Sequence, residues 1–510
     1  MNYSSKKDIE VELQSILHSL KSGDINPSAY DTAWVARIPN KEKTGPRFSK
    51  CLEWVLNNQQ EDGSWGATDV LYYHDRIINT LASILTLKNW NSSNSIINKG
   101  IDFVNENLIN LKKDHHDTIG FELLLPSIVK KLENLGILFN DTNKVIIDSY
   151  VKLGEKKLSK IPLETLYVVK TNLSHSMEFL DGFNLDFKKI NSTQMLGNGS
   201  FGNSPAATSF MLMQVEDSLS EKYIMDLLNT FGDFVPSIYP FEIFERGWIL
   251  DSINYCDIKT QELGEVVDYL KRNWSDKNGI SISNTFPYTD LDDTSLIFKT
   301  LTERNIEISQ DTFQFYKRGE VYVCFPFELD PSVSTYVHFL GALNSIKSIS
   351  KNLEIDRINI IKYIYLFQEP MGFWFDKWHI SPFYTTSHLL IELLKYNNGS
   401  DVEFNKALEW IIDSQNIDGG WGYFDKSTIE ETAYVLEFLI YYYKEYTVDK
   451  SNLELISKGI EYLKSKGSVE EEFISSLWID KGLYSTKTIN KVLFLCVIYL
   501  HLQLKEIFYE

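Results

Sequence analysis

Apolar residues recur along most of the chain at the three- and four-residue spacing that is typical of helices. Residues 9–20, 146–158 and 407–415 each place their apolar side chains on one helical face. Alternating patterns that indicate strands bounded by hairpin turns are scarce, and short breaks rich in Gly, Asn, Asp and Pro separate the helical stretches. The pattern therefore predicts an all-α chain.

One local pattern, Gln-x-x-Asp-Gly-(Ser or Gly)-Trp-Gly, occurs at residues 59–66 and again at 415–422. Each copy follows a helical stretch that contains Leu-Glu-Trp, and its glycines are able to adopt a positive φ after a helix end. We interpret the pattern as a structural turn rather than a functional motif. Two distant copies in 510 residues indicate two related helical domains.

Aromatic residues are the unusual part of the composition. The chain is 43% hydrophobic and 24% charged, which is ordinary, but 14% of its residues are Phe, Tyr or Trp. Most of these rings are expected to fill a core. The alternative for a few of them is a pocket that needs aromatic faces, because the quadrupole of a ring attracts cations.

The charge and the cysteines exclude several classes of protein. A net charge of −20 argues against nucleic-acid binding, although it allows one local basic site for a small anion. The N-terminus lacks the apolar stretch of a signal peptide, and we find no run of about 18 apolar residues that would span a membrane. We expect a soluble, cytoplasmic protein with neither a disulfide framework nor a zinc site, because the cysteines are isolated at Cys51, Cys256, Cys324 and Cys496.

The most informative residues are the three acids Asp290, Asp292 and Asp293. If they are buried, they cannot all ionise, so at least one remains protonated near neutral pH and can act as an acid. The alternatives are an exposed helix start, where Asp interacts favourably with the helix dipole, and a Mg²⁺ site. A metal-binding helical face is not built, because Thr, Ser and Leu follow Asp293. The apolar and aromatic residues on both sides favour a buried acid.

The segment Asp-Leu-Asp-Asp-Thr at 290–294 resembles the DxDD motif of class II terpene cyclases. Further segments resemble copalyl diphosphate synthases in the same order along the chain, including bacterial and fungal members, at 28–39, 58–66, 73–82, 198–214, 376–388, 430–436 and 477–484. The resemblance covers nearly the whole chain.

The resemblance implies two α/α-barrel domains, called β and γ, with the active site between them. Residues 1–30 would form the N-terminal helix of the β domain, 31–264 the inserted γ domain, and 265–510 the rest of β with the DxDD motif. The length leaves no room for the class I domain of bifunctional members. The sequence also lacks a DDxxD motif, which metal-dependent ionising terpene synthases require. Both observations imply that the product keeps its diphosphate.

By the same resemblance, Asp292 is the general acid that protonates the terminal alkene of the substrate. Asp290 and Asp293 would hold it, with Thr294 helping to orient it. His175 matches a family histidine that holds the water that removes the final proton. The alternative is that His175 is an ordinary buried histidine with its hydrogen bonds satisfied. Ser237 stands where the plant enzymes have Asn, which puts the terminating base and the product skeleton in question.

The remaining site residues are also implied by the resemblance. Aromatic residues would shield the carbocation, and Trp248 matches the family's cavity tryptophan; the other candidates are Tyr239, Phe286, Trp374 and Tyr384. The diphosphate would be held by Lys157, Lys160 and Lys377, although exposed lysines are the ordinary alternative. Mg²⁺ is expected with the diphosphate, and Asp114 and Asp117 stand near the family's acidic patch.

These features predict a class II diterpene cyclase that converts geranylgeranyl diphosphate to a bicyclic diphosphate of copalyl, labdane or rearranged type. The nearest alternatives are cyclisation of farnesyl diphosphate to a drimane and a triterpene cyclase. Protein prenylation needs a zinc site that the isolated cysteines do not offer, and a helical scaffold would leave the acids unexplained. A downstream class I terpene synthase is an expected partner. The stereochemistry and the oligomeric state are left open.

Overall fold

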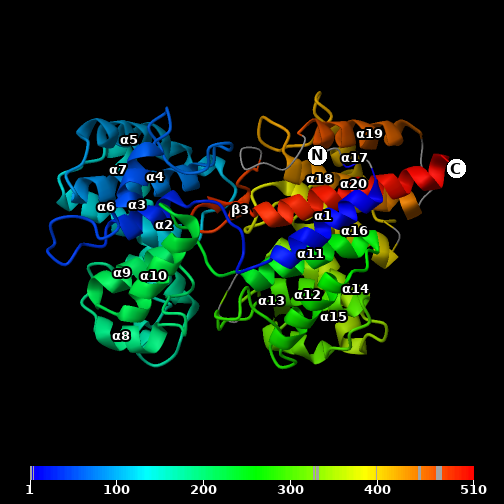
Figure 1. The fold of residues 1–510 in the computed structure, drawn as a ribbon, viewed down its shortest axis with the longest axis horizontal. Coiled ribbons are helices and arrows are strands. Elements are labelled where there is room, and N and C mark those ends of the chain that lie inside the picture. The colour runs from blue at the N-terminus through cyan, green and yellow to red at the C-terminus, as the bar shows by residue number, and fades with distance from the viewer. Residues whose placement is uncertain are drawn as a thin grey trace. The chain divides into compact units, whose positions relative to one another are not determined.

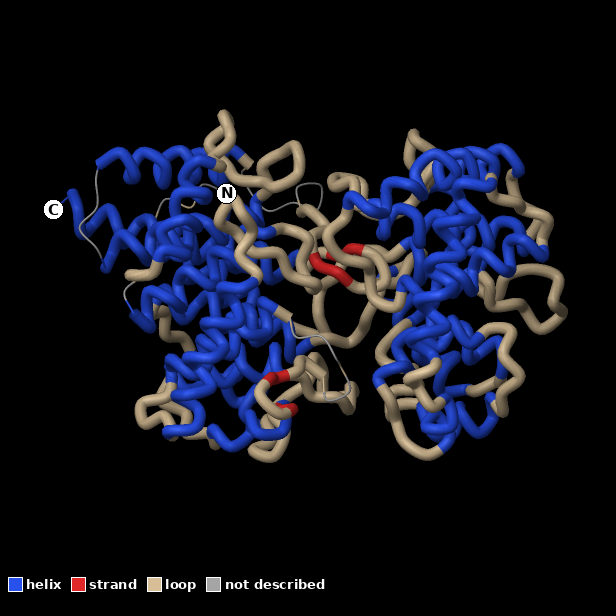
Figure 2. The backbone as a smooth tube through the Cα atoms, turned by 180° about the vertical axis from the view of Figure 1, so that it is seen from behind, coloured by secondary structure: helices blue, strands red, loops and turns tan. Residues whose placement is uncertain are grey.

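The structure is a computed structural model that describes residues 3, 5–325, 328, 332–397, 399–445, 450–466 and 474–509. Helices make up most of these residues, and the strands form two short antiparallel hairpins, drawn in red in Figure 2. The prediction of an all-α chain is confirmed. The periodic segments noted above lie in α1 (Lys6–Ser19), α7 (Asp141–Leu158) and α17 (Val402–Asp413).

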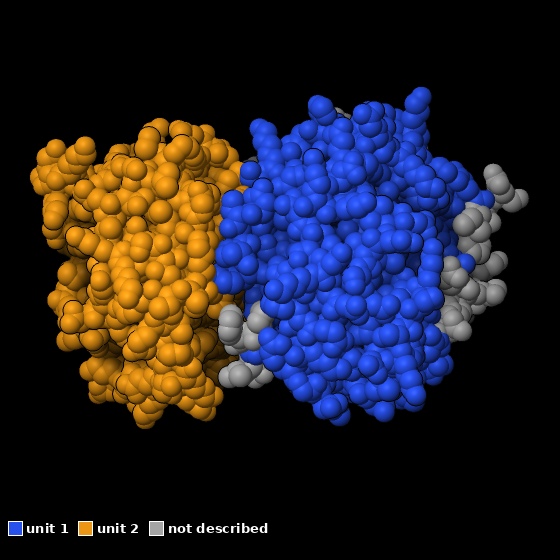
Figure 3. Space-filling model, turned by 90° about the horizontal axis from the view of Figure 1, so that it is seen from below, with its two compact units in different colours: residues 1–24, 241–475, 486–510 blue, residues 25–240, 476–485 orange. Residues whose placement is uncertain are grey.

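The chain divides into two compact units, which Figure 3 shows in different colours. Unit 1 comprises residues 1–24, 241–475 and 486–510, and unit 2 comprises residues 25–240 and 476–485. The sequence analysis placed the boundaries after residues 30 and 264. The structure assigns residues 241–264 to unit 1, because α11 (Glu242–Cys256) packs against α13 (Leu291–Glu303) and α20 (Lys487–Tyr509). It assigns 476–485 to unit 2, because backbone N–H groups of this segment donate to Asp75 and Asn26.

Unit 1 is an α/α barrel, labelled in Figure 1. Its inner helices pack in the order α11, α13, α14 (Val333–Ser345), α16 (Pro382–Asn397), α18 (Ile429–Glu445) and α20, and α20 returns to α11. Outside this ring lie α1, α17, α12 (Gln261–Asn273), α15 (Lys351–Leu366) and α19 (Lys450–Ser465). The unit also contains the 3₁₀ helix η4 (Gln310–Tyr316) and the hairpin of β1 (Lys317–Arg318) and β2 (Val321–Tyr322).

Unit 2 closes a second ring of helices. The order is α2 (Ala29–Ala36), α4 (Tyr73–Asn89), α6 (Phe121–Asn134), the 3₁₀ helix η3 (Asn172–Leu180) and α9 (Pro205–Gln214), which returns to α2. The outer elements are α7, α3 (Ser49–Asn57), α5 (Asn94–Asn107), η1 (Leu108–Lys113), η2 (Leu163–Tyr167), α8 (Phe187–Gln194) and α10 (Ser218–Phe231). The hairpin of β3 (Trp478–Ile479) and β4 (Leu483–Tyr484) belongs to this unit.

The repeated tryptophan turn ties consecutive helix pairs together in both barrels. In each copy the Gln side chain donates to the carbonyl of a Gly four residues later and to a carbonyl on the next outer helix. The indole N–H of Trp65 or Trp421 donates to the preceding outer helix, while its backbone N–H donates to a Thr of the next inner helix. The structural interpretation of this pattern is confirmed.

A third copy of the turn lies at residues 368–375 and was missed in the sequence. Gln368 makes the same two hydrogen bonds, and the indole of Trp374 donates to the Ile364 carbonyl at 2.8 Å. The missed signal is the Gln-to-Gly-to-Trp spacing, which is intact although Met replaces the Asp and Phe replaces the last Gly. Trp374, a candidate for the cation pocket, therefore occupies the position of a turn tryptophan.

Replacing Gly419 with Ala is expected to destabilise unit 1 by about 1–3 kcal/mol. Gly419 has a φ of 87°, and a Cβ atom there would lie 2.7 Å from the Lys458 carbonyl oxygen. The measurement is the change in denaturant midpoint. The matched control is Gly264→Ala in the exposed part of α12, where an added Cβ meets nothing within 4 Å. An equal loss of stability in both variants would contradict the role assigned to the turn.

One helix of the described part of the chain, α20, is long and apolar enough over Lys487–Glu506 to cross a membrane by length and composition alone. Of that segment, 72% is buried inside the protein, where α20 packs against α11 and α18. The core helix of a non-membrane protein meets the same criterion. The expectation that the chain has no membrane-spanning segment stays a prediction.

Candidate active site

The acidic cluster lies at the first turn of the inner helix α13. Asp290 is the N-cap residue of this helix, and its side chain accepts a hydrogen bond from the Asp293 backbone N–H at 2.7 Å. Asp290 and Asp293 are only 3% and 4% exposed. The cluster therefore begins a helix, as one alternative in the sequence analysis proposed, but Asp290 and Asp293 are buried rather than exposed.

Burial changes the protonation of these acids. It raises the pKa of Asp290 above its usual value, and the neighbouring Asp292 raises it further. Burial also raises the pKa of Asp293 strongly, with Asp290 and Asp292 adding to the effect. Asp290 and Asp293 therefore retain protons near neutral pH, as the sequence analysis predicted for at least one acid of a buried cluster.

Asp292 has a partner that the sequence analysis did not identify. His338 Nδ1 lies 2.7 Å from Asp292 Oδ1, and the side chain of this histidine on α14 is almost entirely buried. The only available signal was a histidine within an apolar helix, 46 residues along the chain, and nothing local connects it to the acids. Thr294 instead bonds to Ile280 and to the Tyr316 hydroxyl, so its contacts support the helix start rather than the Asp292 carboxyl.

Rings from three other inner helices form an aromatic group with His338. The Trp248 ring of α11 lies 5.2 Å from the His338 ring, and Tyr384 of α16 lies 5.8 Å from Trp248, both between ring centroids. His388 of α16 and Tyr434 of α18 complete the group, with their rings 4.9 Å apart. The structure therefore brings two predicted cation-pocket residues, Trp248 and Tyr384, together beside the partner of Asp292.

The other predicted aromatic residues lie elsewhere. Phe286 is buried next to Tyr288, with a ring distance of 5.3 Å. Tyr239 belongs to unit 2, where its ring packs against Phe231 and its backbone N–H donates to Asn203. Their contacts are those of packing residues within their own units.

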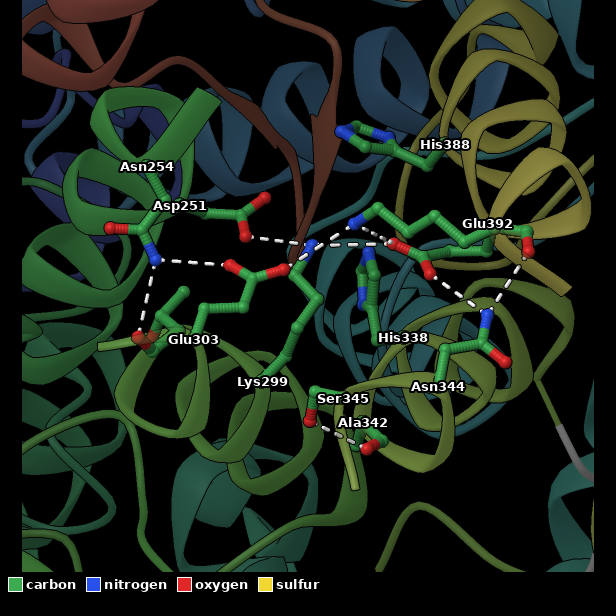
Figure 4. Close-up of polar contacts among 12 residues, drawn as sticks. Asp251, Asn254, Lys299, Glu303, His338, Ala342, Asn344, Ser345, His388 and Glu392 are labelled. Atoms are coloured by element: carbon green, nitrogen blue, oxygen red, sulfur yellow. Dashed lines mark hydrogen bonds and ion pairs between the residues drawn. The ribbon is translucent and has the colours of Figure 1, made fainter. Parts of the chain in front are cut away.

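A layer of buried ions lies further along the same helices. Lys299 stands seven residues after Asp292, which places the two on one face of α13, about 10 Å apart along its axis. Figure 4 shows Asp251 of α11 and Glu392 of α16 directed toward the Lys299 amino group, at 2.7 and 3.6 Å. Glu392 also accepts from Lys395 at 3.2 Å and from Asn344 at 3.1 Å.

The acids and lysines of this layer favour the ionised forms of one another. Burial alone would lower the pKa of Lys299, but Asp251 and other nearby acids raise it well above its usual value. Burial would raise the pKa of Glu392, yet Lys395 and Lys299 lower it. The layer, which we define as Asp251, Lys299, Glu392 and Lys395, joins three of the helices that carry the acid and the rings.

A separate polar cluster in unit 2 contains His175. Its Nδ1 lies 2.9 Å from the Gly202 carbonyl oxygen, and its Nε2 lies 2.8 Å from Asp480 Oδ1. Ser237 is buried beside Asp480, and its hydroxyl helps to lower the pKa of that carboxyl. The structure thus brings His175 and Ser237 to one acid, Asp480, which the sequence analysis did not single out.

The lysines proposed for diphosphate binding belong to different units. Lys157 is exposed and forms an ion pair with Glu122, and Lys160 is exposed nearby in the chain. Lys377 is half-buried in unit 1 and forms an ion pair with Glu328. Their roles stay predictions.

Asp114 and Asp117, the candidate metal ligands, both contact His74. Asp114 Oδ2 lies 2.8 Å from His74 Nδ1, and Asp117 Oδ1 lies 2.9 Å from His74 Nε2. Burial would lower the pKa of His74, but the two acids raise it, so a protonated imidazole lies between them. This arrangement does not fit a Mg²⁺ ion held by both acids. In the described ranges, no group of three or more His, Cys, Asp or Glu side chains is placed to hold a metal.

The fold and the cluster together define a class of protein. An α/α barrel with buried acids at the start of an inner helix, paired with a second helical barrel, is the βγ architecture of class II terpene cyclases. The chain superimposes on the ent-copalyl diphosphate synthase of Streptomyces platensis with a TM-score of 0.79 at 23% identity, covering 97% of this chain and 99% of that one. This likeness establishes the fold.

Sequence comparisons find relatives of this chain among the diterpene cyclases of this class. Residues 329–465 match the squalene-hopene cyclase C-terminal domain family. The chain is 38% identical over 319 residues to a (−)-kolavenyl diphosphate synthase of Tripterygium wilfordii, covering 61% of this chain and 38% of that protein. It is 36% identical over 329 residues to the ent-copalyl diphosphate synthase of Arabidopsis thaliana, covering 64% of this chain and 40% of the relative.

The crystal structure of that Arabidopsis enzyme, in complex with an aza-analogue of geranylgeranyl thiolodiphosphate, gives a TM-score of 0.72 at 26% identity. It covers 96% of this chain and 62% of the other. The chain spans less than half the length of the curated relatives it matches. The predicted resemblance to class II diterpene cyclases of the copalyl diphosphate synthase type is confirmed.

Proposed function

We propose that this chain is a class II diterpene cyclase, which cyclises geranylgeranyl diphosphate to a bicyclic diphosphate without breaking the bond to the diphosphate. The observation that carries the proposal is the pairing of Asp292 with His338 inside a buried acidic cluster, next to the ring of Trp248. Its relatives named as kolavenyl and copalyl diphosphate synthases support this substrate class.

The acid step follows from the geometry of α13. His338 engages Asp292 Oδ1, so this contact fixes the orientation of the carboxyl group, and Oδ2 is the oxygen that we assign to the substrate. A proton moves from the Asp292 carboxyl to the terminal alkene, whose electron pair forms the new C–H bond and leaves a tertiary cation. The adjacent buried acids keep negative charge low around Asp292, and a buried site protects the acid from levelling by water.

The rings around His338 suit the cation that follows. Each ring closure moves the positive charge to a new carbon as an alkene pair forms a C–C bond, and the faces of Trp248, Tyr384 and Tyr434 attract that charge without adding to it. Burial, followed by the charges of His338 and Lys299, lowers the pKa of His388 well below its usual value. His388 is therefore neutral and does not repel the cation.

The reaction adds one proton to the substrate and removes one proton from the last cation, so the product is an isomer of the substrate. Because the diphosphate is retained, a class I terpene synthase that ionises it is the proposed consumer of the product. We further propose that Mg²⁺ enters with the substrate phosphates rather than in a dedicated protein site, and that the protein works in a reducing, cytoplasmic compartment. The four buried free cysteines support the last point.

The test is incubation of the purified protein with geranylgeranyl diphosphate and Mg²⁺, with farnesyl diphosphate and squalene in parallel. Phosphatase treatment and mass spectrometry of the released alcohols then identify the skeletons. A bicyclic C20 alcohol is expected. Cyclised farnesyl diphosphate or squalene with unchanged geranylgeranyl diphosphate would replace the substrate assignment, and conversion of none of the three would refute the proposed activity.

Turnover is expected to hold near neutral pH and to fall as the pH rises toward about 9. The acid must be protonated to react, and the raised pKa of Asp290 and of Asp293 keeps the cluster protonated at neutrality. Losing those protons at higher pH adds negative charge beside Asp292 and weakens it as an acid. The measurement is kcat against pH, with thermal unfolding recorded at each pH. A kcat that rises steadily over the same interval would rule out an acid of this kind.

A further inference from the structure

We propose that His388 of α16 is the base that takes the final proton from the cyclised cation, through the lone pair of its Nε2 atom, and thereby determines which alkene the product carries. The proposal rests on the proposed function, since a cyclase of this kind must lose one proton for each proton that its acid adds. Every contact that carries it lies within unit 1, which also contains Asp292.

The hydrogen bond of His388 places its proton on one ring nitrogen and its lone pair on the other. Nδ1 lies 2.8 Å from the backbone carbonyl oxygen of Tyr384, one helical turn earlier. A carbonyl oxygen can only accept, so Nδ1 carries the proton. In a neutral imidazole, Nε2 then has a lone pair and no proton. His388 therefore presents a basic nitrogen at the end of its side chain.

The Nε2 atom of His388 remains accessible inside the protein. The residue is 5% exposed, and among the described residues its Nε2 makes no hydrogen bond. This nitrogen is not one of the polar atoms that are both fully buried and without a hydrogen bond, whereas Nδ1 of the buried His501 is. The accessible part of His388 therefore includes the lone pair, which is the condition for contact with a substrate.

The nitrogen lies among the rings that we assign to the cation. The His388 ring lies 4.9 Å from Tyr384, 4.9 Å from Tyr434 and 5.5 Å from Trp248, between ring centroids, and each pair meets edge to face. A cation held against the faces of these rings is thus next to a nitrogen that accepts protons.

The other polar atoms of this aromatic group are engaged elsewhere or have no lone pair to offer. The Tyr434 hydroxyl donates to a carboxylate on its own helix at 3.2 Å. His338 Nδ1 lies 2.7 Å from Asp292 Oδ1, and its Nε2 lies 3.5 Å from the Tyr384 hydroxyl. An indole nitrogen only donates. His388 Nε2 is therefore the nitrogen of this group that we assign to the substrate proton.

The electrostatic surroundings keep His388 in the form that accepts a proton. Burial, followed by the charges of His338 and Lys299, holds its pKa well below the usual value, so the imidazole is unprotonated when a cation forms beside it. A proton on the carbon next to a carbocation is far more acidic than an imidazolium, so a weak base is sufficient to remove it. The same low pKa makes His388 give the proton up again.

Packing on both sides fixes the position of His388. Tyr384, His388 and Glu392 follow one another at four-residue intervals, so they lie on one face of α16. Tyr384 belongs to the aromatic group, and Glu392 belongs to the ionic layer, where it accepts from Lys395 and Asn344 (Figure 4). A base held between two packed layers reaches one part of the cation, which is the property that selects a single alkene.

The chemical step balances. A C–H bond next to the cationic carbon breaks, its electron pair becomes the second bond of the new C=C group, and the proton forms an N–H bond with His388 Nε2. The imidazolium passes this proton to water as the product leaves, and Asp292 takes a proton from solvent before the next turnover. Without this base, the cation is expected to lose a different proton or to be captured by water, which adds a hydroxyl group to the product.

The experiment compares the wild type, His388→Phe and His501→Phe with geranylgeranyl diphosphate, and it measures substrate consumption separately from product composition. Phe keeps an aromatic ring in place and removes the lone pair. We expect His388→Phe to consume substrate within about tenfold of the wild-type rate, because the acid is intact, while the wild-type product becomes a minority of the total. His501, on α20, is another buried histidine of unit 1, and burial lowers its pKa to about 4. His501→Phe is expected to leave product composition unchanged.

His388→Gln is the second variant, because its amide is polar and able to hold a water but is not an imidazole base. We expect it to form a product with an added hydroxyl group, whereas His388→Phe is expected to form other alkenes. An unchanged product from whichever of the two variants folds, as judged by thermal unfolding, would overturn the proposal and favour the role predicted for His175. Equal shifts in His501→Phe and His388→Phe would show a general packing effect and overturn it as well. A wild type that does not cyclise the substrate would instead refute the proposed function.

Discussion

Replacing Asp292 with Asn is expected to lower turnover of geranylgeranyl diphosphate by about 10²–10⁴-fold. The amide has nearly the shape of the carboxyl group and is able to keep a hydrogen bond to His338, which lies 2.7 Å from Asp292 Oδ1. It has no acidic proton for an alkene. The variant also places one fewer acid in a buried cluster, so its stability is expected to equal or exceed that of the wild type. Substrate consumption and thermal unfolding are the two measurements.

The control for this change is Asp268→Asn, on the exposed side of α12 in the same unit. It makes the same chemical replacement away from the cluster and is expected to leave turnover within about twofold of the wild type. Full turnover in Asp292→Asn would remove Asp292 as the acid. Lost turnover with an equal loss in the control would point to misfolding instead.

Replacing Lys299 with Met is expected to reduce the free energy of unfolding of unit 1 by about 3–5 kcal/mol. Met fills a similar volume but leaves Asp251 and Glu392, which are 2% and 3% exposed, without the amino group between them. Removing one partner of a buried charge pair is costly, because the other charge is left in a medium of low dielectric. Denaturant unfolding measures the change.

Lys362→Met, at an exposed position of α15, is the matched control and is expected to change stability by less than about 0.5 kcal/mol. A stable Lys299→Met variant would show that the ionic layer relaxes or takes up water. A second readout concerns the site. Lys299 lies on the same face of α13 as Asp292, so we expect folded Lys299→Met protein to show a lower kcat than Lys362→Met.

Much of the fold could be predicted from local patterns. The helical spacing of apolar residues indicated an all-α chain, and the tryptophan turns at 59–66 and 415–422 indicated two related domains, because both signals lie in short stretches of sequence. The third turn at 368–375 was missed because its Asp and its last Gly are replaced, although its hydrogen bonds are the same. The division of the chain at 475 and 485 was not predictable, since the bonds from that hairpin to Asp75 and Asn26 span more than 400 residues.

The candidate site, like the fold, could be predicted from the sequence only in part. The acidic cluster was visible because its members are adjacent, and the aromatic neighbours of the cluster favoured burial. His338 and Asp480 were invisible, because each meets its partner only when a distant element packs against it. His175 was indicated by the resemblance, whereas its partners Gly202 and Asp480 follow from packing, and its role in holding the deprotonating water stays a prediction.

The sequence by itself determined which segments are helices, where the tryptophan turns stand and that three acids begin one helix, because spacing, caps and adjacency are local properties of a chain. Only the tertiary structure decided that Asp290 and Asp293 are buried, that His338 holds Asp292, and that an ionic layer lies further along the same helices as the rings. Burial and pairing set the pKa of each group, and both depend on which helices the closed barrel brings together.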